Sequence, residues 1–514
     1  MSSQNHANGT VESSSNLIPY AGSESEFEYQ SGHSRGSRAS DLLRRVTQYT
    51  EYSVASGEAG REEEAEEEAR RKQHLASQPT RHGFWSRHNG AMRKMFFKQW
   101  VTVILVLCAY VLAVFSIYRG SMYKRLDRLT NLKVLVVVED DRTGILTSTL
   151  LQSLESPAVA HLAGWTVNNY IPEDEVIDLI SKEKYWGSIY VSAPNVSTQL
   201  VSAFQKGQNV SDVALVRCYY ETARDLMGVS LYAKPALLQA GAVFDTFLQE
   251  EVYPGLIAGL SAGQFAALRN TSTLTNPPDI LFTDGNPVTN PVLLAPLQVG
   301  LIYMIILSLF QILWFLKING DMAKFLRPIN YIAYRMTMSQ VNCLVISLAY
   351  ACLNRAFQID MNRKWKGGFG VMWMVSFLVM SACGGANENI FLVTGAILPP
   401  LGGFWILFFV ILNISATFSP IELCPAVFRF TYALPIKNGY ELMKMILLGT
   451  YSGHIGRYFG VLVAWVVLNN LLMPFCLLFF ANMSKKKIVT ELAKEKAEDQ
   501  DDERSEPGKT ARTP

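Results

Sequence analysis

The chain has 514 residues, of which 49% are hydrophobic and 18% are charged, against about 25% charged residues in an average soluble domain. The formal net charge is only +2, which gives no reason to expect nucleic-acid binding. We therefore expect a membrane protein with no nucleic-acid partner, and not a self-contained enzyme.

Residues 1–90 are rich in Ser, Gly, Glu and Arg and carry an acidic run at 62–68. Such a segment does not bury enough apolar surface to offset the entropy lost on ordering. We predict that residues 1–90 form a disordered cytosolic tail.

Six apolar stretches follow, and a helix needs about 20 apolar residues to cross the hydrocarbon core of a bilayer. They lie at 100–118, at 292–316, at 342–353 (with 337–341 added to reach spanning length), at 369–383, at 391–418 and at 459–481. Gly384 and Gly385 are expected to end the fourth span. The chain is thus predicted to be an α-helical polytopic membrane protein. It has a first transmembrane helix at 100–118, a five-span membrane domain at 292–481 and a charged cytosolic tail at 482–514.

Residues 119–291 separate the first span from the other five. Strands are predicted at 132–138, 165–170, 186–192 and 213–220, and helices at 143–154, 172–184, 197–204 and 235–269, the last broken near Pro254. Alternation of this kind is typical of strands that pair in one sheet covered by helices. The segment is therefore predicted to be an inserted extracytoplasmic α/β or α+β domain.

Basic residues orient the spans, because Lys and Arg gather on the cytosolic side of membrane helices. Basic residues from Lys317 to Arg335 follow the second span, whereas no Lys or Arg occurs at 271–296, before it. A triple lysine at 485–487 likewise follows the sixth span. Both spans are predicted to run outside to inside, which places both termini in the cytosol. The basic loop at 355–366 does not follow this rule, since the predicted orientation places it outside.

Three Asn-X-Ser sequons, at Asn195, Asn209 and Asn270, fall in the 119–291 segment. Glycan addition requires exposure to the lumen of the endoplasmic reticulum, so these asparagines are predicted glycosylation sites and support the orientation. Such tripeptides also arise by chance.

No catalytic residue is predicted. The segment 259–263 (GLSAG) matches the nucleophile elbow of α/β-hydrolases, but that motif needs a strand before its serine, here Ser261. The preceding residues are predicted to be helical. His161 and His454 are isolated, so no metal or cofactor site is predicted. The chain also lacks the GxxxxGK[ST] phosphate-binding loop, so an ATP-driven process would need a separate ATPase partner.

Residues that interrupt the apolar stretches are candidates for a transport path. Glu388 lies near a predicted span, and Pro399, Pro400, Gly402 and Gly403 interrupt the fifth span. A broken membrane helix can line a cavity, and we expect these residues to line the path. The alternatives are an interfacial loop at Glu388 and a passive kink at the Pro and Gly pairs.

Two segments resemble a known group of membrane proteins. Residues 184–200 (KYWGSIYVSAPNVSTQL) resemble the outer-domain signature of the phage-infection-protein-like branch of the ABC-2 exporter superfamily. Residues 432–443 (YALPIKNGYELM) resemble its segment before the last span, and the neighbouring 440–449 is amphipathic, as in helices that lie in the outer interface or re-enter the membrane. Together with the order of one span, a large domain and five spans, residues 100–481 are similar to the fungal nitrosoguanidine-resistance membrane proteins.

The resemblance implies an ABC-2 permease-like fold, a homodimer in the lipid bilayer and a location in the plasma membrane, reached through the endoplasmic reticulum. It implies a transporter-like role in resistance to toxic small molecules, including nitrosoguanidine, by export. One alternative is a non-transporting regulator or scaffold that affects plasma-membrane phospholipid asymmetry. A membrane hydrolase is the third. The resemblance assigns no catalytic residue.

Overall fold

The computed structural model describes residues 84–208, 215–271 and 280–505. The acidic run at 62–68 and Asn209 lie outside the described residues. A boundary within the first helix, at Lys98–Gln99, separates two units. All contacts described below lie within the second unit, Gln99–Pro514.

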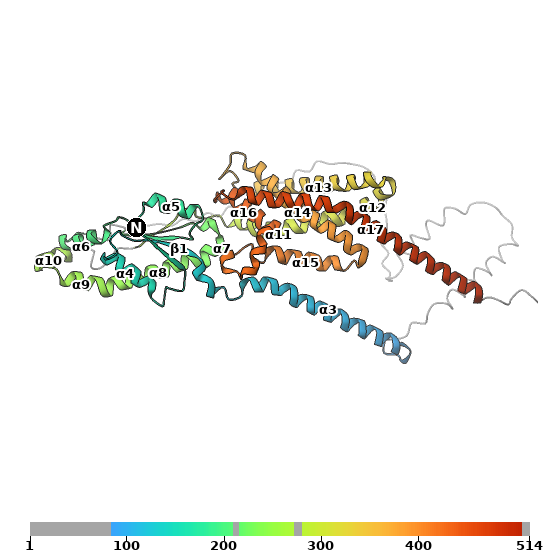
Figure 1. Cartoon of the computed structure of the whole chain (residues 1–514), viewed down its shortest axis with the longest axis horizontal. Coiled ribbons are helices and arrows are strands. Elements are labelled where there is room, and N and C mark those ends of the chain that lie inside the picture. Colours follow the sequence, from blue (N-terminus) through green and yellow to red (C-terminus); the bar gives the residue numbers. More distant parts are fainter. Residues whose placement is uncertain (1–83, 209–214, 272–279, 506–514) are drawn as a thin grey trace, which may run out of the picture. The chain divides into compact units, whose positions relative to one another are not determined.

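A five-stranded sheet occupies part of the segment between the first two membrane helices (Figure 1). Its strands, in the order β2-β1-β3-β4-β5, are β1 (Lys133–Val137), β2 (Gly164–Asn168), β3 (Ser188–Val191), β4 (Val216–Tyr220) and β5 (Leu281–Asp284). Among the described strands, β3 and β4 pair antiparallel, and the other neighbours pair parallel. The four predicted strands are confirmed as β1 to β4. The sequence did not predict β5, which is short and only partly buried at the edge of the sheet.

Helices cover both faces of this sheet. They are α4 (Ile145–Glu155), α5 (Glu173–Ser181), α6 (Val196–Lys206), α8 (Lys234–Phe247), α9 (Tyr253–Ala258) and α10 (Ala262–Arg269). The short helix α7 (Leu226–Gly228) packs instead through Leu226 with the membrane helices. Val134 and Val136 of β1 pack in one core with α4, α6 and α8. Leu135 and Val137 point to the opposite face and pack with α5. This burial on both faces explains the continuous apolar run of β1. We call residues 126–284 the sheet region.

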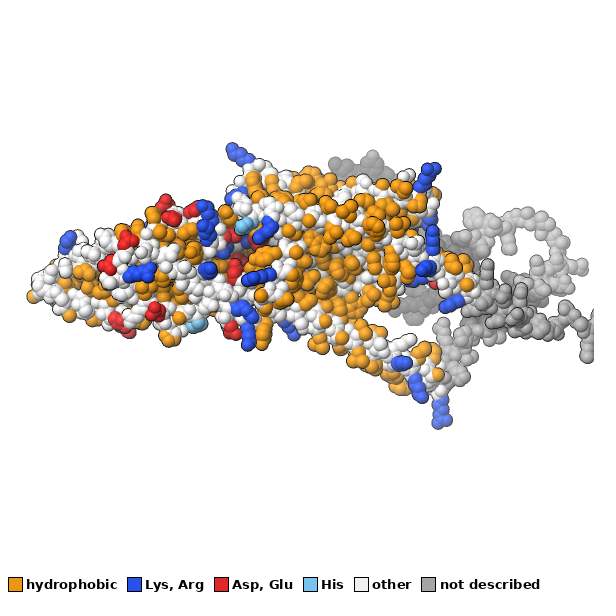
Figure 2. Space-filling model, in the orientation of Figure 1, with side chains coloured by type: hydrophobic (Ala, Val, Ile, Leu, Met, Phe, Trp, Pro, Cys, Tyr) orange, Lys and Arg blue, Asp and Glu red, His pale blue; other side chains and the backbone are white. Residues whose placement is uncertain are grey.

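The described residues include five helices that are long and apolar enough to cross a membrane. They are α3 (Gly90–Met122), the stretch Pro291–Trp314 that contains α11 (Gly300–Trp314), α13 (Pro328–Ala356), α14 (Gly368–Ile397) and α17 (Ile455–Ser505). The short helix α12 (Leu316–Phe325) links α11 to α13. Figure 2 shows hydrophobic side chains over much of the surface of these helices, whereas charged side chains are scattered over the sheet region. The chain is an α-helical polytopic membrane protein.

Contacts between helices give their directions. Gly385 of α14 lies beside Asn469 of α17, and Gly395 lies beside Phe480, so these two helices run parallel. The chain therefore has to return along the bundle between Ile397 and Ile455. The first helix of this return is α15 (Leu401–Ile414), an apolar helix of 14 residues. At about 1.5 Å per residue, α15 is about 21 Å long, shorter than the hydrocarbon core of about 30 Å.

The prediction that Gly384 and Gly385 end the fourth span is wrong, because α14 continues through them to Ile397. A Cβ atom at Gly385 would lie 2.7 Å from Cβ of Asn469 in α17, and one at Gly384 would lie 3.3 Å from Cβ of Ser308 in α11. Small residues let membrane helices approach closely. The glycine pair therefore serves helix packing.

The predicted span at 391–418 is also corrected. Its first residues belong to α14, and Pro399 and Pro400 lie in the turn between α14 and α15. Proline lacks a backbone donor and restricts the residue before it, so the pair separates two helices and does not kink one.

The helix α16 (Pro435–Leu448) lies inside the bundle. It is buried along nearly its whole length and packs against α14 and α17. The amphipathic pattern of residues 440–449 therefore belongs to a helix buried within the protein, and not to one that lies exposed in the outer interface. Gly449, with φ 71°, ends the helix in the left-handed conformation that glycine adopts readily.

Candidate functional site

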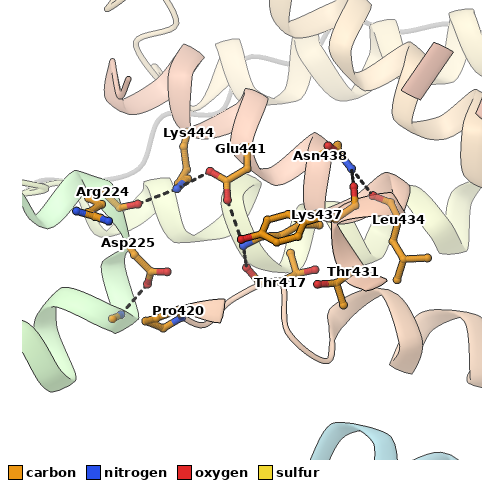
Figure 3. A network of polar contacts seen from close by, with 12 residues as sticks. Arg224, Asp225, Thr417, Pro420, Thr431, Leu434, Lys437, Asn438, Glu441 and Lys444 are labelled. Atoms are coloured by element: carbon orange, nitrogen blue, oxygen red, sulfur yellow. Dashed lines mark hydrogen bonds and ion pairs between the residues drawn. The ribbon is translucent and has the colours of Figure 1, made fainter. Parts of the chain in front are cut away.

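Arg224 links the segment 184–200 to α16 where the sheet region meets this helix. Figure 3 shows Arg224 beside the charged side chains of α16. The Arg224 guanidinium lies over the Trp186 ring, with 4.1 Å between Cζ and the ring centroid, and donates a hydrogen bond to the Tyr185 carbonyl oxygen. The Arg224 carbonyl oxygen accepts a 2.7 Å hydrogen bond from Lys444 Nζ. Arg224 therefore joins residues 184–200 to the helix that contains most of residues 432–443.

Three charged side chains of α16 form a buried cluster at this junction. Glu441 makes ion pairs of 3.1 Å with Lys437 and 2.6 Å with Lys444. Spacings of four and three residues place all three side chains on one helix face. Lys437 also donates a 3.3 Å hydrogen bond to the Thr417 carbonyl oxygen. The cluster thus holds α16 to the sheet region on one side and to the segment after α15 on the other.

The sheet region adds further charge to this junction. Burial raises the pKa of Glu183, against the opposing effect of the nearby Lys444 and Arg224. Burial also raises the pKa of Glu221 and lowers the pKa of Arg224. The charges of the sheet region and of α16 therefore act on one another across the junction, in surroundings from which water is largely removed.

A cavity of about 640 Å³ lies next to the junction, within the range of about 300–1,000 Å³ that is usual for ligand pockets. Four parts of the chain line it: the end of α3 with the turn that follows, the sheet region at 227–232, the start of the second membrane helix and the end of α15. The lining residues are Tyr118, Met122, Lys124, Arg125, Leu126, Asp127, Met227, Leu231, Tyr232, Gln298, Ile414, Ser415, Phe418, Ser419 and Pro420. The cavity therefore lies where membrane helices meet the sheet region.

Arg125 connects three of these parts. Its guanidinium donates long hydrogen bonds to Tyr232 Oη (3.4 Å), to the Ser121 carbonyl oxygen (3.5 Å) and to Ser419 Oγ (3.2 Å). The preceding Lys124 has φ 49°, a left-handed conformation that non-glycine residues seldom adopt. This turn at the end of α3 directs two consecutive cationic residues to the cavity lining.

A second buried charge pair lies within the membrane helices. Arg335 of α13 pairs with Glu388 of α14, and Ser339 donates a 2.8 Å hydrogen bond to the same carboxylate. The side chains of Arg335 and Glu388 are only 6% and 5% exposed. The cavity beside them measures about 10 Å³, room for about one water molecule. The interfacial loop considered for Glu388 is wrong, since this residue lies within a helix.

Arg335 was not predicted to be part of a site. It follows the predicted span at 292–316 and was therefore counted among the basic residues of a cytosolic loop. The polar residues Ser339 and Asn342, which follow it in an otherwise apolar stretch, were the available signal. Polar side chains within membrane helices usually face the bundle interior.

The other residues predicted to line a path do not join Glu388. Pro399 and Pro400 are exposed in the turn after α14, and Gly402 lies against the Phe391 ring. None of Pro399, Pro400, Gly402 and Gly403 lies in the lining of the 640 Å³ cavity or of the small cavity at Glu388. The structure therefore separates the predicted residues into two places.

Of the predicted glycosylation sites, Asn195 and Asn270 are described, and both are exposed. Asn195 precedes α6. Ser197 of the same sequon is buried, and its backbone N–H donates a 2.7 Å hydrogen bond to the buried Glu139 carboxylate. Glu139 thus occupies the start of α6, the position where a helix dipole favours an anion. After folding, the Ser197 hydroxyl is no longer accessible.

Ser261 is the N-cap of α10. It shares a capping box with Gln264 and follows the helix α9 and a turn, where a nucleophile elbow has a strand. In the described part of the chain, no group of three or more His, Cys, Asp or Glu side chains is arranged to hold a metal ion.

The long apolar helices and the polar cluster at their junction with a sheet define a polytopic membrane protein with a sheet region built between its first two membrane helices. Residues 103–471 match the family described as "Protein of unknown function (DUF3533)", and the chain belongs to this family. It is 29% identical over 434 residues to an uncharacterized endoplasmic reticulum membrane protein of Saccharomyces cerevisiae. The aligned region covers 80% of this chain and 85% of the yeast protein. No solved structure matches the chain.

Proposed function

We propose that the protein is a transporter-like membrane protein that exports toxic small molecules, nitrosoguanidine among them, or otherwise confers resistance to them, and that it catalyses no reaction of its own. The observation that supports this proposal is the 640 Å³ cavity, which both membrane helices and the sheet region line. A mostly apolar cavity with a few polar groups is typical of small-molecule sites. Its place at the ends of membrane helices suits a molecule that enters from the bilayer.

This proposal is tested in a strain that lacks the gene, by comparing the resistance restored by the wild-type protein with that restored by a variant whose cavity is filled. Leu231 lines the cavity and is 54% exposed, so Leu231→Trp fills space with little effect on folding. Leu238→Trp is the matched control, because Leu238 is 44% exposed in the same region and lies outside the lining. We expect Leu231→Trp to lose resistance and Leu238→Trp to keep it. Equal resistance of both variants, at equal protein levels, contradicts a role for the cavity.

The alternative is a non-transporting regulator or scaffold that alters plasma-membrane phospholipid asymmetry. The observation that favours it is the small size of the cavity beside Glu388, about 10 Å³, which leaves no room for a substrate at that level of the bundle. Purified protein in liposomes separates the two functions. Movement of neither drug nor labelled lipid, with and without an ATPase partner, excludes transport. A membrane hydrolase stays the third candidate, and loss of resistance in Ser261→Ala would support it.

The proposed orientation has both termini in the cytosol and the sheet region on the extracytoplasmic side. It is supported by the helix directions: α3 runs toward the sheet region, since Tyr110 contacts Phe404 and Gly120 contacts Phe428, and α17 runs away from it. Asn→Gln changes at the three sequons test the orientation. If glycosidase treatment leaves the mobility of the wild type unchanged, the support that the sequons give to this orientation is lost.

The proposal further includes a homodimer, a separate ATPase partner and a plasma-membrane location. The yeast relative bears the name of an endoplasmic reticulum membrane protein, so the location needs its own test. Fluorescent tagging at the C-terminus with markers for both membranes provides it, and size-exclusion chromatography with light scattering measures the oligomeric state.

A further inference from the structure

The charges and apolar groups of the 640 Å³ cavity indicate what it binds. We propose that it takes an anionic amphiphile, with the anionic group at Arg125 and Lys124 and the hydrocarbon part along the apolar wall. This inference adds a ligand class to the cavity of the proposed function and rests on that function only in assuming that the cavity is a binding site.

Arg125 supplies the cationic end. Among the described residues, no carboxylate lies within 4.0 Å of its guanidinium. Its Nε atom is buried and has no hydrogen-bond partner. Its other nitrogens make long bonds of 3.2–3.5 Å to Tyr232, Ser121 and Ser419, and the uncharged Cys424 thiol lies beside the guanidinium. By contrast, Arg217 at the sheet surface pairs with Glu173 at 2.8 Å. A half-buried guanidinium in this state has unused capacity for an anion.

The net charge of the lining has the same sign. Lys124 and Arg125 contribute two positive charges and Asp127 one negative charge, so the lining carries 2 − 1 = +1. Basic pockets beside membrane helices attract anionic head groups. A cationic amphiphile would instead meet an unfavourable charge.

The remaining wall is apolar. Met122, Met227, Leu231, Ile414 and Phe418 line it, and the flexible thioether side chains of methionine adapt to ligands of irregular shape. A free inorganic anion would gain nothing from this wall. A molecule with both an anionic group and a hydrocarbon part satisfies both halves of the cavity, and the ends of the membrane helices lie where a bilayer presents such molecules.

Isothermal titration calorimetry on the purified full chain in detergent tests the proposal. The probes are dioctanoyl phosphatidic acid, dioctanoyl phosphatidylcholine, rhodamine 6G and inorganic phosphate. We expect the phosphatidic acid to bind at least about tenfold more tightly than the phosphatidylcholine or the cationic rhodamine 6G, the difference typical of one charge-assisted contact. Inorganic phosphate should not compete. Equal binding of the two lipids, or displacement by inorganic phosphate, overturns the proposal.

Variants locate the site. Arg125→Gln should lower the affinity for phosphatidic acid by about tenfold, and Arg125→Lys should keep most of it. Arg119→Gln is the matched control, since Arg119 is exposed on α3 outside the lining, and should bind as the wild type does. If Arg125→Gln does not fold, Lys124→Gln is tested in its place, because Lys124 is exposed. The proposal is overturned if Lys124→Gln binds phosphatidic acid as tightly as the wild type does. It is also overturned if Arg119→Gln loses as much affinity as the variant of the cavity lining.

The titration also separates this inference from the proposed function. Tight binding of rhodamine 6G that Leu231→Trp abolishes would overturn the anionic preference and leave export of small molecules standing. Absence of binding by all four probes, together with unchanged resistance of Leu231→Trp, would overturn both.

Discussion

The two buried charge clusters differ in how their charges are held. At the junction, Glu441 has two cationic partners on its own helix, Lys437 and Lys444. In the bundle, Glu388 has one cationic partner among the described residues, Arg335, which lies on a different helix. The first cluster keeps a counter-ion when one cation is removed, whereas the second does not. Removal of one member of a buried pair is costly because the remaining charge stays desolvated.

The largest expected effect is at Arg335. Arg335→Met leaves Glu388 buried with Ser339 as its remaining partner, and we expect a loss of about 3–5 kcal/mol in the free energy of unfolding. Thermal unfolding in detergent, followed by size-exclusion chromatography, measures it. The double variant Arg335→Met/Glu388→Leu is the control and should recover most of the loss, because a neutral apolar pair needs no counter-ion. A single variant as stable as the wild type would show that the pair is not buried in the membrane protein.

Lys444→Met should have a smaller effect, about 2 kcal/mol. Glu441 keeps Lys437 at 3.1 Å, but the Arg224 carbonyl oxygen loses its 2.7 Å bond to Nζ. Limited proteolysis should therefore detect loosening of the sheet region from α16 in addition to the lower melting temperature. If Lys444→Met destabilises the protein more than Arg335→Met does, Lys437 does not compensate the charge of Glu441. The proposed difference between the two charge clusters is then wrong.

Ser339→Ala should cost about 1 kcal/mol, since it removes one neutral donor from Glu388 and leaves Arg335 in place. Ser347→Ala is the matched control on the same helix, because its hydroxyl bonds only the Leu344 carbonyl oxygen. The difference between their melting temperatures measures the contribution of the donor. No difference would mean that Arg335 alone satisfies the carboxylate.

The smallest effect is expected at Glu183, which faces Lys444, Arg224, Glu441 and His454 across the junction. Burial raises its pKa above the ordinary 4.5, so the folded state retains the proton more readily than the unfolded state. Stability from this group is present below about pH 4.5 and is lost as the pH rises through the raised pKa. At pH 7, Glu183→Gln should therefore raise the melting temperature by about 1 °C, and the difference should vanish in acid. A lower melting temperature at pH 7 would show that Lys444 and Arg224 outweigh burial.

The two clusters also differ in how far the sequence revealed them. The Lys-Glu-Lys spacing of α16 can be read from one helical segment, although the Arg224 carbonyl that completes the site lies 220 positions away. Arg335 and Glu388 are 53 residues apart, and no local pattern connects them. The 640 Å³ cavity was not predicted at all, because its lining comes from four distant parts of the chain.

The sequence by itself determined which segments are apolar enough to enter a membrane and, with the exception of β5, which short runs form strands. Hydropathy and backbone periodicity act over neighbouring residues, so these features depend on local composition. Only the tertiary structure decided that Gly384 and Gly385 pack helices, that Glu388 meets Arg335 and that Arg224 links residues 184–200 to α16. These depend on which faces of distant segments pack against each other, and the fit between whole elements sets that choice.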